Sequence, residues 1–321
     1  AGMADKIGIF GNMVVFSSYA MQVIMSFLML AMIFMMLPRA QVSANRINEV
    51  LDTEITVKDG TIDNNTNNEV GTVEFKNVGF KYPDGEDYVL KDISFKANKG
   101  ETVAFIGSTG SGKSTLINLV PRFYDATEGE ILVDGVNVKD YKLTSLYNKI
   151  GYVAQKAVIF NDTVSGNVSY GDNGKGEISR EKVKEAIEVA QGKDFVEKME
   201  NSYDTQMAQG GSNVSGGQKQ RISIARAIAR NPEIYIFDDS FSALDYKTDS
   251  ILRKELKKYT KDATTLIVAQ RIGTIMNADK ILVLDEGNLV GMGTHKELLE
   301  SCEVYKQIAL SQLSKEELDN A

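Results

Sequence analysis

Hydrophobic residues are concentrated near the start of the chain. Residues 13–37 read MVVFSSYAMQVIMSFLMLAMIFMML, a run without a formal charge. A helix of this length is about 37 Å long, and the hydrocarbon core of a membrane is about 30 Å thick. Arg39 and Arg46 follow the run, and positive residues favour the cytoplasmic side. The pattern predicts one membrane-spanning helix whose C-terminal flank is cytoplasmic.

This run has two other interpretations. A signal peptide has an apolar region of only about 7–15 residues, which is shorter than residues 13–37. A buried helix of a soluble domain stays open as the alternative. After the run, QVSANRINEVLDTE continues as an amphipathic helical pattern, and residues 57–70 are polar and rich in Asn, Asp, Thr and Gly. This composition is typical of a linker.

From Gly71 onward, short β-rich runs alternate with helical patterns. The β-rich runs include TVEFKNVGF, TVAFIG, EIYIFDD, TTLIVAQ and KILVLDEGNLVG. The helical patterns include SREKVKEAIEVAQ, QKQRISIARAIARN and one closing pattern over residues 295–313. This alternation predicts an α/β fold with a substantial parallel sheet.

Composition and charge exclude several classes of protein. The 321 residues carry a net charge of −8, so general nucleic-acid binding through clustered cations is not expected. The single cysteine, Cys302, excludes an intrachain disulfide framework. The single histidine, His295, excludes a multi-histidine metal site. We interpret His295 as a surface residue at a helix start.

The strongest motif follows the β-rich run TVAFIG. Residues 107–115 read GSTGSGKST and fit the phosphate-loop pattern G-x-x-x-x-G-K-[ST]. Glycines let backbone N–H groups curve around phosphate oxygens, and the following helix directs its positive end to the same anion. Lys113 supplies a positive charge, and the Ser114 hydroxyl is a ligand for Mg²⁺. The predicted nucleotide-binding residues of this loop are Gly107, Ser108, Thr109, Gly110, Ser111, Gly112, Lys113, Ser114 and Thr115.

A second candidate is an acidic strand end. The hydrophobic run Ile234–Phe237 ends in Asp238 and Asp239. A buried strand that delivers a carboxylate to a nucleotide pocket is suited to Mg²⁺ binding, and we assign that role to Asp238.

Two further segments identify a family. Residues 215–218 read SGGQ, and residues 242–245 read SALD. Together with the phosphate loop, their order resembles ATP-binding cassette (ABC) proteins, and the resemblance covers about residues 71–311. The hydrophobic run followed by the cassette resembles the C-terminal end of an ABC exporter half-transporter. In that family six membrane helices precede the cassette, so the resemblance implies a multi-pass membrane protein of which this chain is a part.

The resemblance implies a fold and a division of the chain. The fold is an α/β P-loop NTPase cassette with a RecA-like core, a β-rich subdomain and a helical subdomain, preceded by one transmembrane helix. Residues 1–48 would be the last transmembrane helix and its cytoplasmic extension, and residues 49–70 the linker. Residues 71–311 would be the cytoplasmic nucleotide-binding domain, and residues 312–321 a tail.

The resemblance also implies roles for individual residues. Tyr82 would stack on adenine, and Gln155 would sense Mg²⁺ and connect to the membrane domain. Asp245 would reach toward a partner cassette. The segment that would contact the γ-phosphate of an ATP held by the partner consists of Ser215, Gly216, Gly217 and Gln218. Two cassettes would then enclose two ATP molecules, each with Mg²⁺.

Two residues depart from the family pattern. The residue after the Mg²⁺ aspartate is usually glutamate, which orients the attacking water, and here it is Asp239. The family usually has histidine where Gln270 stands. Aspartate is one methylene shorter than glutamate, and glutamine carries no positive charge. The pair resembles the degenerate site of heterodimeric ABC exporters, which binds ATP and hydrolyses it slowly.

The sequence therefore predicts an ATP-binding subunit of an ABC exporter in the cell membrane, with a hydrolysis-impaired site of its own. Its partners would be a second, different half-transporter chain, membrane lipid and an unidentified transported substrate. Two alternatives stay open, a regulatory subunit that never hydrolyses ATP and a homodimeric exporter with ordinary ATPase activity. A DNA-acting ABC ATPase is disfavoured, because about 100 residues without sustained heptads separate Thr115 from Ser215.

Overall fold

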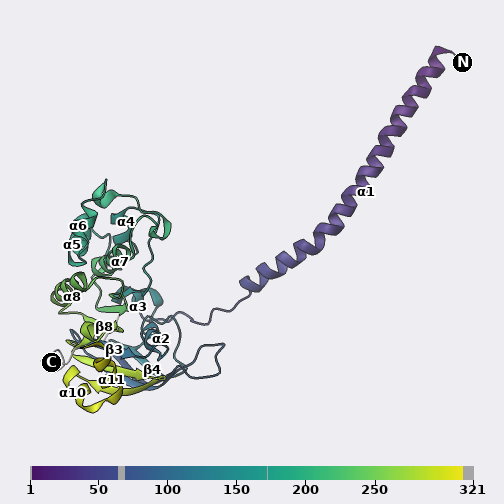
Figure 1. Cartoon of the computed structure of the whole chain (residues 1–321). Coiled ribbons are helices and arrows are strands. Elements are labelled where there is room, and N and C mark those ends of the chain that lie inside the picture. The colour runs from purple at the N-terminus through teal and green to yellow at the C-terminus, as the bar shows by residue number, and fades with distance from the viewer. Residues whose placement is uncertain (1, 64–68, 172, 314–321) are drawn as a thin grey trace. The chain divides into compact units, whose positions relative to one another are not determined.

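The computed structural model describes residues 2–63, 69–171 and 173–313, and the chain divides into two compact units, residues 1–56 and 57–321. The first unit is the helix α1 (Met3–Leu51), which has 49 residues and contains Pro38 (Figure 1). The helix is longer than the hydrophobic run that predicted it, because the helical pattern continues on both sides. None of its described residues is buried.

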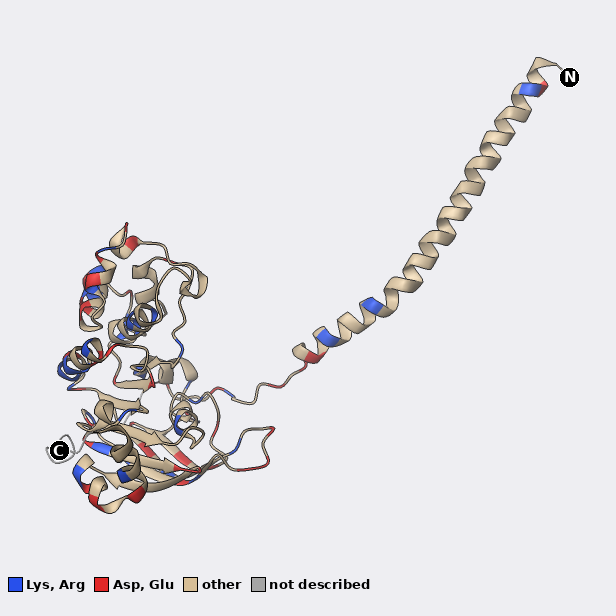
Figure 2. Cartoon of the chain, viewed as in Figure 1, with Lys and Arg blue, Asp and Glu red and all other residues tan. Residues whose placement is uncertain are grey.

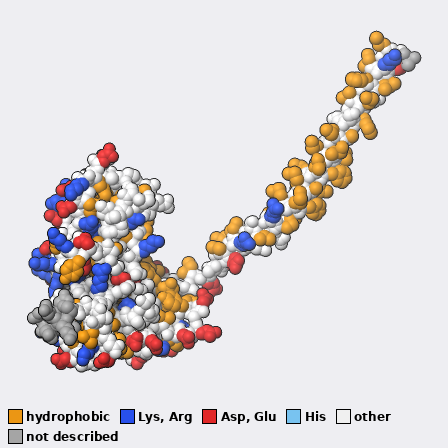
Figure 3. Space-filling model, viewed as in Figure 1, with side chains coloured by type: hydrophobic (Ala, Val, Ile, Leu, Met, Phe, Trp, Pro, Cys, Tyr) orange, Lys and Arg blue, Asp and Glu red, His pale blue; other side chains and the backbone are white. Residues whose placement is uncertain are grey.

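The surface of α1 is apolar over most of its length. Its charged residues lie near its two ends, and its middle carries none (Figure 2). Hydrophobic side chains cover the helix between those ends (Figure 3). By length and composition α1 is suited to crossing a membrane. An exposed apolar surface of this extent is unfavourable in water, so α1 is expected to lie in apolar surroundings.

The second unit contains two sheets surrounded by helices. Its strands are β1 (Val73–Phe80), β2 (Leu90–Ala97), β3 (Thr102–Gly107), β4 (Glu128–Val133), β5 (Val136–Asn137), β6 (Ile150–Val153), β7 (Ile234–Asp238), β8 (Thr264–Val268), β9 (Lys280–Asp285) and β10 (Asn288–Gly293). Its α-helices are α2 (Lys113–Leu119), α3 (Leu143–Lys149), α4 (Val164–Val168), α5 (Arg180–Val189), α6 (Lys193–Val196), α7 (Gly216–Arg230), α8 (Tyr246–Tyr259), α9 (Ile272–Ile275), α10 (His295–Ser301) and α11 (Glu303–Gln312). Short 3₁₀ turns, η1 (Ser202–Asp204) and η2 (Gln209–Gly211), precede α7.

The larger sheet has the strand order β10-β9-β3-β8-β7-β6. Neighbouring strands in it are parallel, except that β10 is antiparallel to β9. The smaller sheet has the order β2-β1-β4-β5 and is antiparallel. Side chains on a strand alternate between its faces, so the larger sheet contributes to two cores. Val103 and Phe105 pack toward the smaller sheet and α2, whereas Ala104 and Ile106 pack toward α4, α5 and α7.

The polar linker is attached to the second unit at two places. The backbone N–H groups of Thr61 and Ile62 both donate to the carbonyl of Asp140 at 2.9 Å. The Lys142 ammonium pairs with Asp63 at 2.6 Å. Residues 64–68 of the predicted linker lie outside the described residues. The second attachment involves residues 69–72 and a buried polar cluster.

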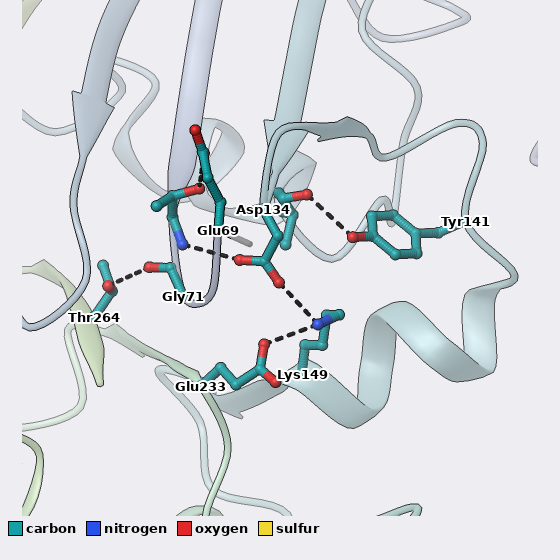
Figure 4. Close-up of polar contacts among 9 residues, drawn as sticks. Glu69, Gly71, Asp134, Tyr141, Lys149, Glu233 and Thr264 are labelled. Atoms are coloured by element: carbon teal, nitrogen blue, oxygen red, sulfur yellow. Dashed lines mark hydrogen bonds and ion pairs between the residues drawn. The ribbon is translucent and has the colours of Figure 1, made fainter. Parts of the chain in front are cut away.

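The buried polar cluster contains Asp134, Lys149 and Glu233 (Figure 4). The Lys149 Nζ lies 2.8 Å from Asp134 Oδ2 and 2.9 Å from Glu233 Oε2. The other oxygen of Asp134 accepts from the backbone N–H of Thr72 at 3.0 Å. Thr264 donates from its hydroxyl to the carbonyl of Gly71. The cluster therefore joins the end of the linker to the start of β7 and β8.

The C-terminal region differs from its prediction in two respects. The closing helical pattern forms two helices, α10 and α11, because the backbone at Cys302 is extended, with φ −122° and ψ 105°. His295 does begin a helix, but the expectation of a surface position is wrong, since only 5 % of it is exposed. The helix α11 reaches Gln312, the first residue of the expected tail. Residues 314–321 of that tail lie outside the described residues.

Candidate functional site

The phosphate loop connects β3 to α2. Its backbone requires glycine at two places. Gly107 has φ 154°, and a Cβ there would lie 2.0 Å from the carbonyl oxygen of Leu284. Gly112 has φ 96°, and a Cβ there would lie 2.7 Å from the Leu90 side chain. A larger residue at either position would displace the loop, so these glycines place backbone N–H groups at the N-terminus of α2.

Lys113 begins α2, and its side chain turns back over the loop. Its Nζ donates to the carbonyls of Gly107 at 2.9 Å and Ser108 at 2.6 Å, and to the Ser111 hydroxyl at 3.2 Å. Burial lowers the pKa of Lys113, while the nearby carboxylates of Asp239 and Asp238 raise it. The ammonium is therefore held among neutral oxygens at the place where an anion would bind.

Asp238 ends β7 beside the phosphate loop. Its Oδ1 accepts from the Ser114 hydroxyl at 2.7 Å, and its Oδ2 lies 3.5 Å from the Tyr152 hydroxyl. Burial raises the pKa of Asp238 above its ordinary value, although the Ser114 hydrogen bond acts in the opposite direction. A hydroxyl and a carboxylate oxygen this close together form a donor pair that fits Mg²⁺. The described residues contain no cluster of three His, Cys, Asp or Glu. Gln155, the third residue predicted for the Mg²⁺ site, lies 3.2 Å from Asp239 through its amide nitrogen.

Three residues predicted for the site, Asp239, Gln155 and Gln270, meet at the Asp239 carboxylate. The amide nitrogens of Gln155 and Gln270 both donate to Asp239 Oδ2, at 3.2 Å and 3.0 Å. Gln155 follows β6 and Gln270 follows β8, and both strands are neighbours of β7. Parallel strands end at the same edge of the sheet, which brings these side chains together. Asp239 has φ 45°, a conformation that aspartate adopts more readily than most residues, and burial raises its pKa.

Tyr82 lies next to the phosphate loop. Its hydroxyl is 2.9 Å from the Thr115 hydroxyl. Its ring packs edge-to-face against Phe80 at 4.9 Å and Tyr124 at 5.2 Å between ring centroids. The structure thus brings the predicted adenine-stacking residue to the helix that begins with Lys113.

The SGGQ segment occupies a different part of the surface. Ser215 is the N-cap of α7, and its hydroxyl accepts from the backbone N–H of Gln218, whose side chain bonds back to the N–H of Ser215. A Cβ at Gly217 would lie 3.3 Å from the carbonyl of Ala243, so this segment adjoins the SALD loop. Within the described ranges, no hydrogen bond joins residues 215–218 to the phosphate loop. Asp245 caps α8 by accepting from the N–H of Thr248 at 3.0 Å.

Two site residues were not singled out from the sequence. Tyr152 donates to Asn118 at 2.8 Å and contacts Asp238, and Tyr124 packs on Tyr82. Tyr152 lies on β6, which is the parallel neighbour of β7, the strand that carries Asp238. Its place in a β-rich run of the sequence was the one indication that it could lie near the site. Tyr124 carried no comparable signal, since it lies in a turn after α2.

The chain is similar in sequence to known proteins. The family model described as ABC transporter matches residues 90–242. An uncharacterised ABC transporter ATP-binding protein of Mycobacterium bovis is 44 % identical over 305 residues, which cover 94 % of this chain and 52 % of that protein. A Staphylococcus aureus protein, named as a candidate multidrug export ATP-binding/permease protein, is 44 % identical over 260 residues, which cover 81 % of this chain and 44 % of that protein.

A solved structure shows the same fold. The structure of a bacterial Atm1-family ABC exporter with ATP bound has a TM-score of 0.80 and 36 % sequence identity. The match covers 89 % of this chain and 50 % of that chain. The predicted cassette fold is therefore confirmed. This chain spans about half the length of the relatives it matches. It carries an ABC transporter ATP-binding cassette and is homologous to the ATP-binding/permease proteins of ABC exporters.

Proposed function

We propose that this chain is the ATP-binding part of an ABC exporter subunit and that it couples ATP binding in a pair of cassettes to export across a membrane. The supporting observation is the convergence of Gln155 and Gln270 on one oxygen of Asp239, beside the bonded pair of Ser114 and Asp238. This arrangement supports the proposal, because nucleotide hydrolysis requires a polar group that orients water near the phosphates, and Asp239 would be that group.

In this proposal the phosphate loop and Lys113 hold the phosphates of ATP. Ser114 and Asp238 hold Mg²⁺, which would neutralise charge on the phosphate oxygens when bound. Tyr82 contacts the adenine. The SGGQ segment and Asp245 face the nucleotide of a second cassette. This part of the proposal is supported by the exposed N-cap positions of Ser215 and Asp245, which are open to a partner.

We further propose that this chain's own site hydrolyses ATP slowly. The Asp239 carboxylate is about 1–1.5 Å shorter in reach than a glutamate would be, and misplacement of about 1 Å costs on the order of 100-fold in rate. Gln270 is neutral, so it stabilises negative charge on a γ-phosphate less than a histidinium would. A second half-transporter chain with glutamate and histidine at these positions would then supply the faster site.

The helix α1 completes the proposal. We place it across the cell membrane as the last span of a multi-pass membrane domain, in contact with lipid, with the cassette in the cytoplasm. Its exposed apolar surface and the flanking Arg39 and Arg46 support this orientation.

The proposal is tested by the steady-state ATPase rate of the full chain in detergent with Mg²⁺ and ATP. Wild type is compared with the double variant Asp239→Glu/Gln270→His, and ATP binding is measured for both. We expect wild type to bind ATP and to turn over on the order of 100-fold more slowly than the double variant. Lys113→Ala serves as the control that loses ATP binding.

Each outcome of this experiment favours one hypothesis about the function over the others. Equal and rapid turnover by wild type and the double variant would overturn the slow site and favour a homodimeric exporter. ATP binding without turnover in either protein would favour a regulatory subunit that does not hydrolyse ATP. Absence of ATP binding by wild type would overturn the whole proposal.

A further inference from the structure

Gln312, the last residue of α11, contacts the backbone on both sides of Arg271. Its Nε2 donates to the carbonyl of Gln270 at 2.8 Å, and its Oε1 accepts from the N–H of Ile272 at 2.9 Å. The side-chain amide of Gln312 thus forms hydrogen bonds with a backbone carbonyl and a backbone N–H of residues 270–272. The side chain of Gln270 in turn donates to Asp239 at 3.0 Å, so a single residue separates α11 from the centre of the site.

The helix that carries Gln312 is itself well anchored. Tyr305 of α11 is fully buried, and its hydroxyl is 2.6 Å from Nδ1 of His295 in α10. Ala309, one turn before the end of α11, is also fully buried. The position of Gln312 therefore depends on packed side chains of the core, although Gln312 itself is exposed.

A second contact holds the same segment from another side. Arg253 of α8 donates from Nη1 to the carbonyls of Gly273 at 2.8 Å and Thr274 at 3.3 Å. Its remaining nitrogens bond to both oxygens of Asp249 at 2.9 Å and 3.1 Å, which fixes the guanidinium. Arg253 thus fixes the segment after Ile272, and Gln312 fixes the part that carries Gln270.

We propose that Gln312 is a positioning residue for the nucleotide site, because it holds the backbone that aims Gln270 at Asp239. The inference rests on the proposed ATPase function. Among the described residues, the hydrogen bonds of the Gln312 side chain go to the backbone at positions 270 and 272, so Gln312 acts on whatever side chain stands at position 270. Loss of both hydrogen bonds frees residues 270–272 to shift by up to about 1 Å. Catalytic rates are sensitive to displacements of this size. Substrate affinity depends on other residues and is expected to stay constant.

The experiment uses Gln312→Met in the full chain in detergent. Methionine matches glutamine in length and helix propensity but removes both hydrogen bonds. The matched control is Gln307→Met, the same change at an exposed position on the same helix. Amide hydrogen exchange is measured for a peptide that covers residues 270–275. ATPase kinetics are measured in the Asp239→Glu/Gln270→His background, in which we expect the fastest turnover.

We expect Gln312→Met to speed exchange in this peptide and to lower kcat about fivefold with KM for ATP unchanged, as loss of a hydrogen bond implies. The control should change neither quantity. Unchanged exchange, or faster exchange with kcat equal to that of the control, would overturn the positioning role while the ATPase function stands. Absence of turnover in the background protein itself would overturn the proposed function, and the positioning role with it.

Discussion

At the level of single residues, Tyr82 has two parts, a ring and a hydroxyl, that would have different roles in the site. In the proposed function, the ring of Tyr82 would stack on a base, while its hydroxyl contacts Thr115 at 2.9 Å. Stacking requires only the ring, whereas the contact with α2 requires the hydroxyl. A substitution that removes only the hydroxyl can therefore be compared with one that removes the whole ring. The comparison distinguishes a role in adenine binding from a purely structural role.

We expect Tyr82→Ala to weaken ATP binding by about 1–3 kcal/mol, because a base loses its stacking surface. Tyr82→Phe keeps the ring and removes the Thr115 contact, so its affinity should stay close to that of wild type. Titration calorimetry with ATP and a thermal melt of each variant measure both effects. If Tyr82→Ala lowered the melting temperature and left the affinity for ATP unchanged, the tyrosine would be structural.

Burial raises the pKa of Asp238, so the folded state holds its proton more tightly than the unfolded state does. As pH rises through the raised pKa, the folded protein without nucleotide loses this proton and with it part of its stability. We therefore expect Asp238→Asn to raise the melting temperature at pH 7 and the difference to vanish below about pH 4, near the ordinary pKa of aspartate. Asp262→Asn, at an exposed position, is the control. A lower melting temperature of Asp238→Asn at pH 7 would contradict this account.

At the scale of elements, the linker is held by side chains that the sequence places far apart. Lys149 ends α3, Asp134 follows β4, and Glu233 precedes β7. Burial alone would lower the pKa of Lys149, but its hydrogen bonds to Asp134 and Glu233 raise it, so the ammonium stays charged in the folded protein. The Asp134 side chain is fully buried, and the exposed fraction of Lys149 is 15 %.

We expect Lys149→Met to destabilise the second unit by about 3 kcal/mol, because it leaves the buried Asp134 carboxylate without this cation. Lys142→Met is the matched control. Its exposed pair with Asp63 should contribute less than about 1 kcal/mol. Urea unfolding of the full chain, followed by tyrosine fluorescence, measures both. Equal effects of the two substitutions would show that burial of the Lys149 pair has no energetic consequence.

At the scale of the whole molecule, the SGGQ segment has an internal role and a proposed external one. Ser215 caps α7 within the chain, and its position at the exposed N-terminus of that helix also suits contact with a phosphate on a partner. Aspartate is as good an N-cap as serine but repels phosphate. A change to aspartate therefore removes the external role and leaves the internal one.

In the Asp239→Glu/Gln270→His background, we expect Ser215→Asp to lower turnover on the order of 100-fold, since one phosphate contact is replaced by repulsion. Its melting temperature should not change. Addition of wild-type chain should restore turnover, because wild type supplies an intact Ser215 to the variant's competent site. Ser212→Asp, in the same exposed loop, is the control. Failure of wild type to restore turnover would contradict a site shared between two chains.

Much of this molecule could be derived from its sequence, because the relevant signals are local. The glycines of residues 107–112 are required by backbone conformation, and the strand before them ends where the loop must begin. The spacing of apolar residues is enough to predict which segments form strands and which form helices. The length of the apolar run in α1 is enough to predict a helix that can span a membrane. The phosphate loop, the acidic end of β7 and the membrane-length helix were therefore visible without coordinates.

Other features depended on contacts between distant segments, which no local pattern encodes. The closing helical pattern divides at Cys302, and His295 is buried because it meets Tyr305 of the next helix. The order β6-β7-β8 brings Gln155 and Gln270 to one oxygen of Asp239, although 115 positions separate the two glutamines in the numbering. Residue types and their local spacing were sufficient to predict the phosphate loop and the acidic strand end. The meeting of Gln155, Gln270 and Asp239 follows from the folded structure, because long-range packing sets the distances between groups that lie far apart in the chain.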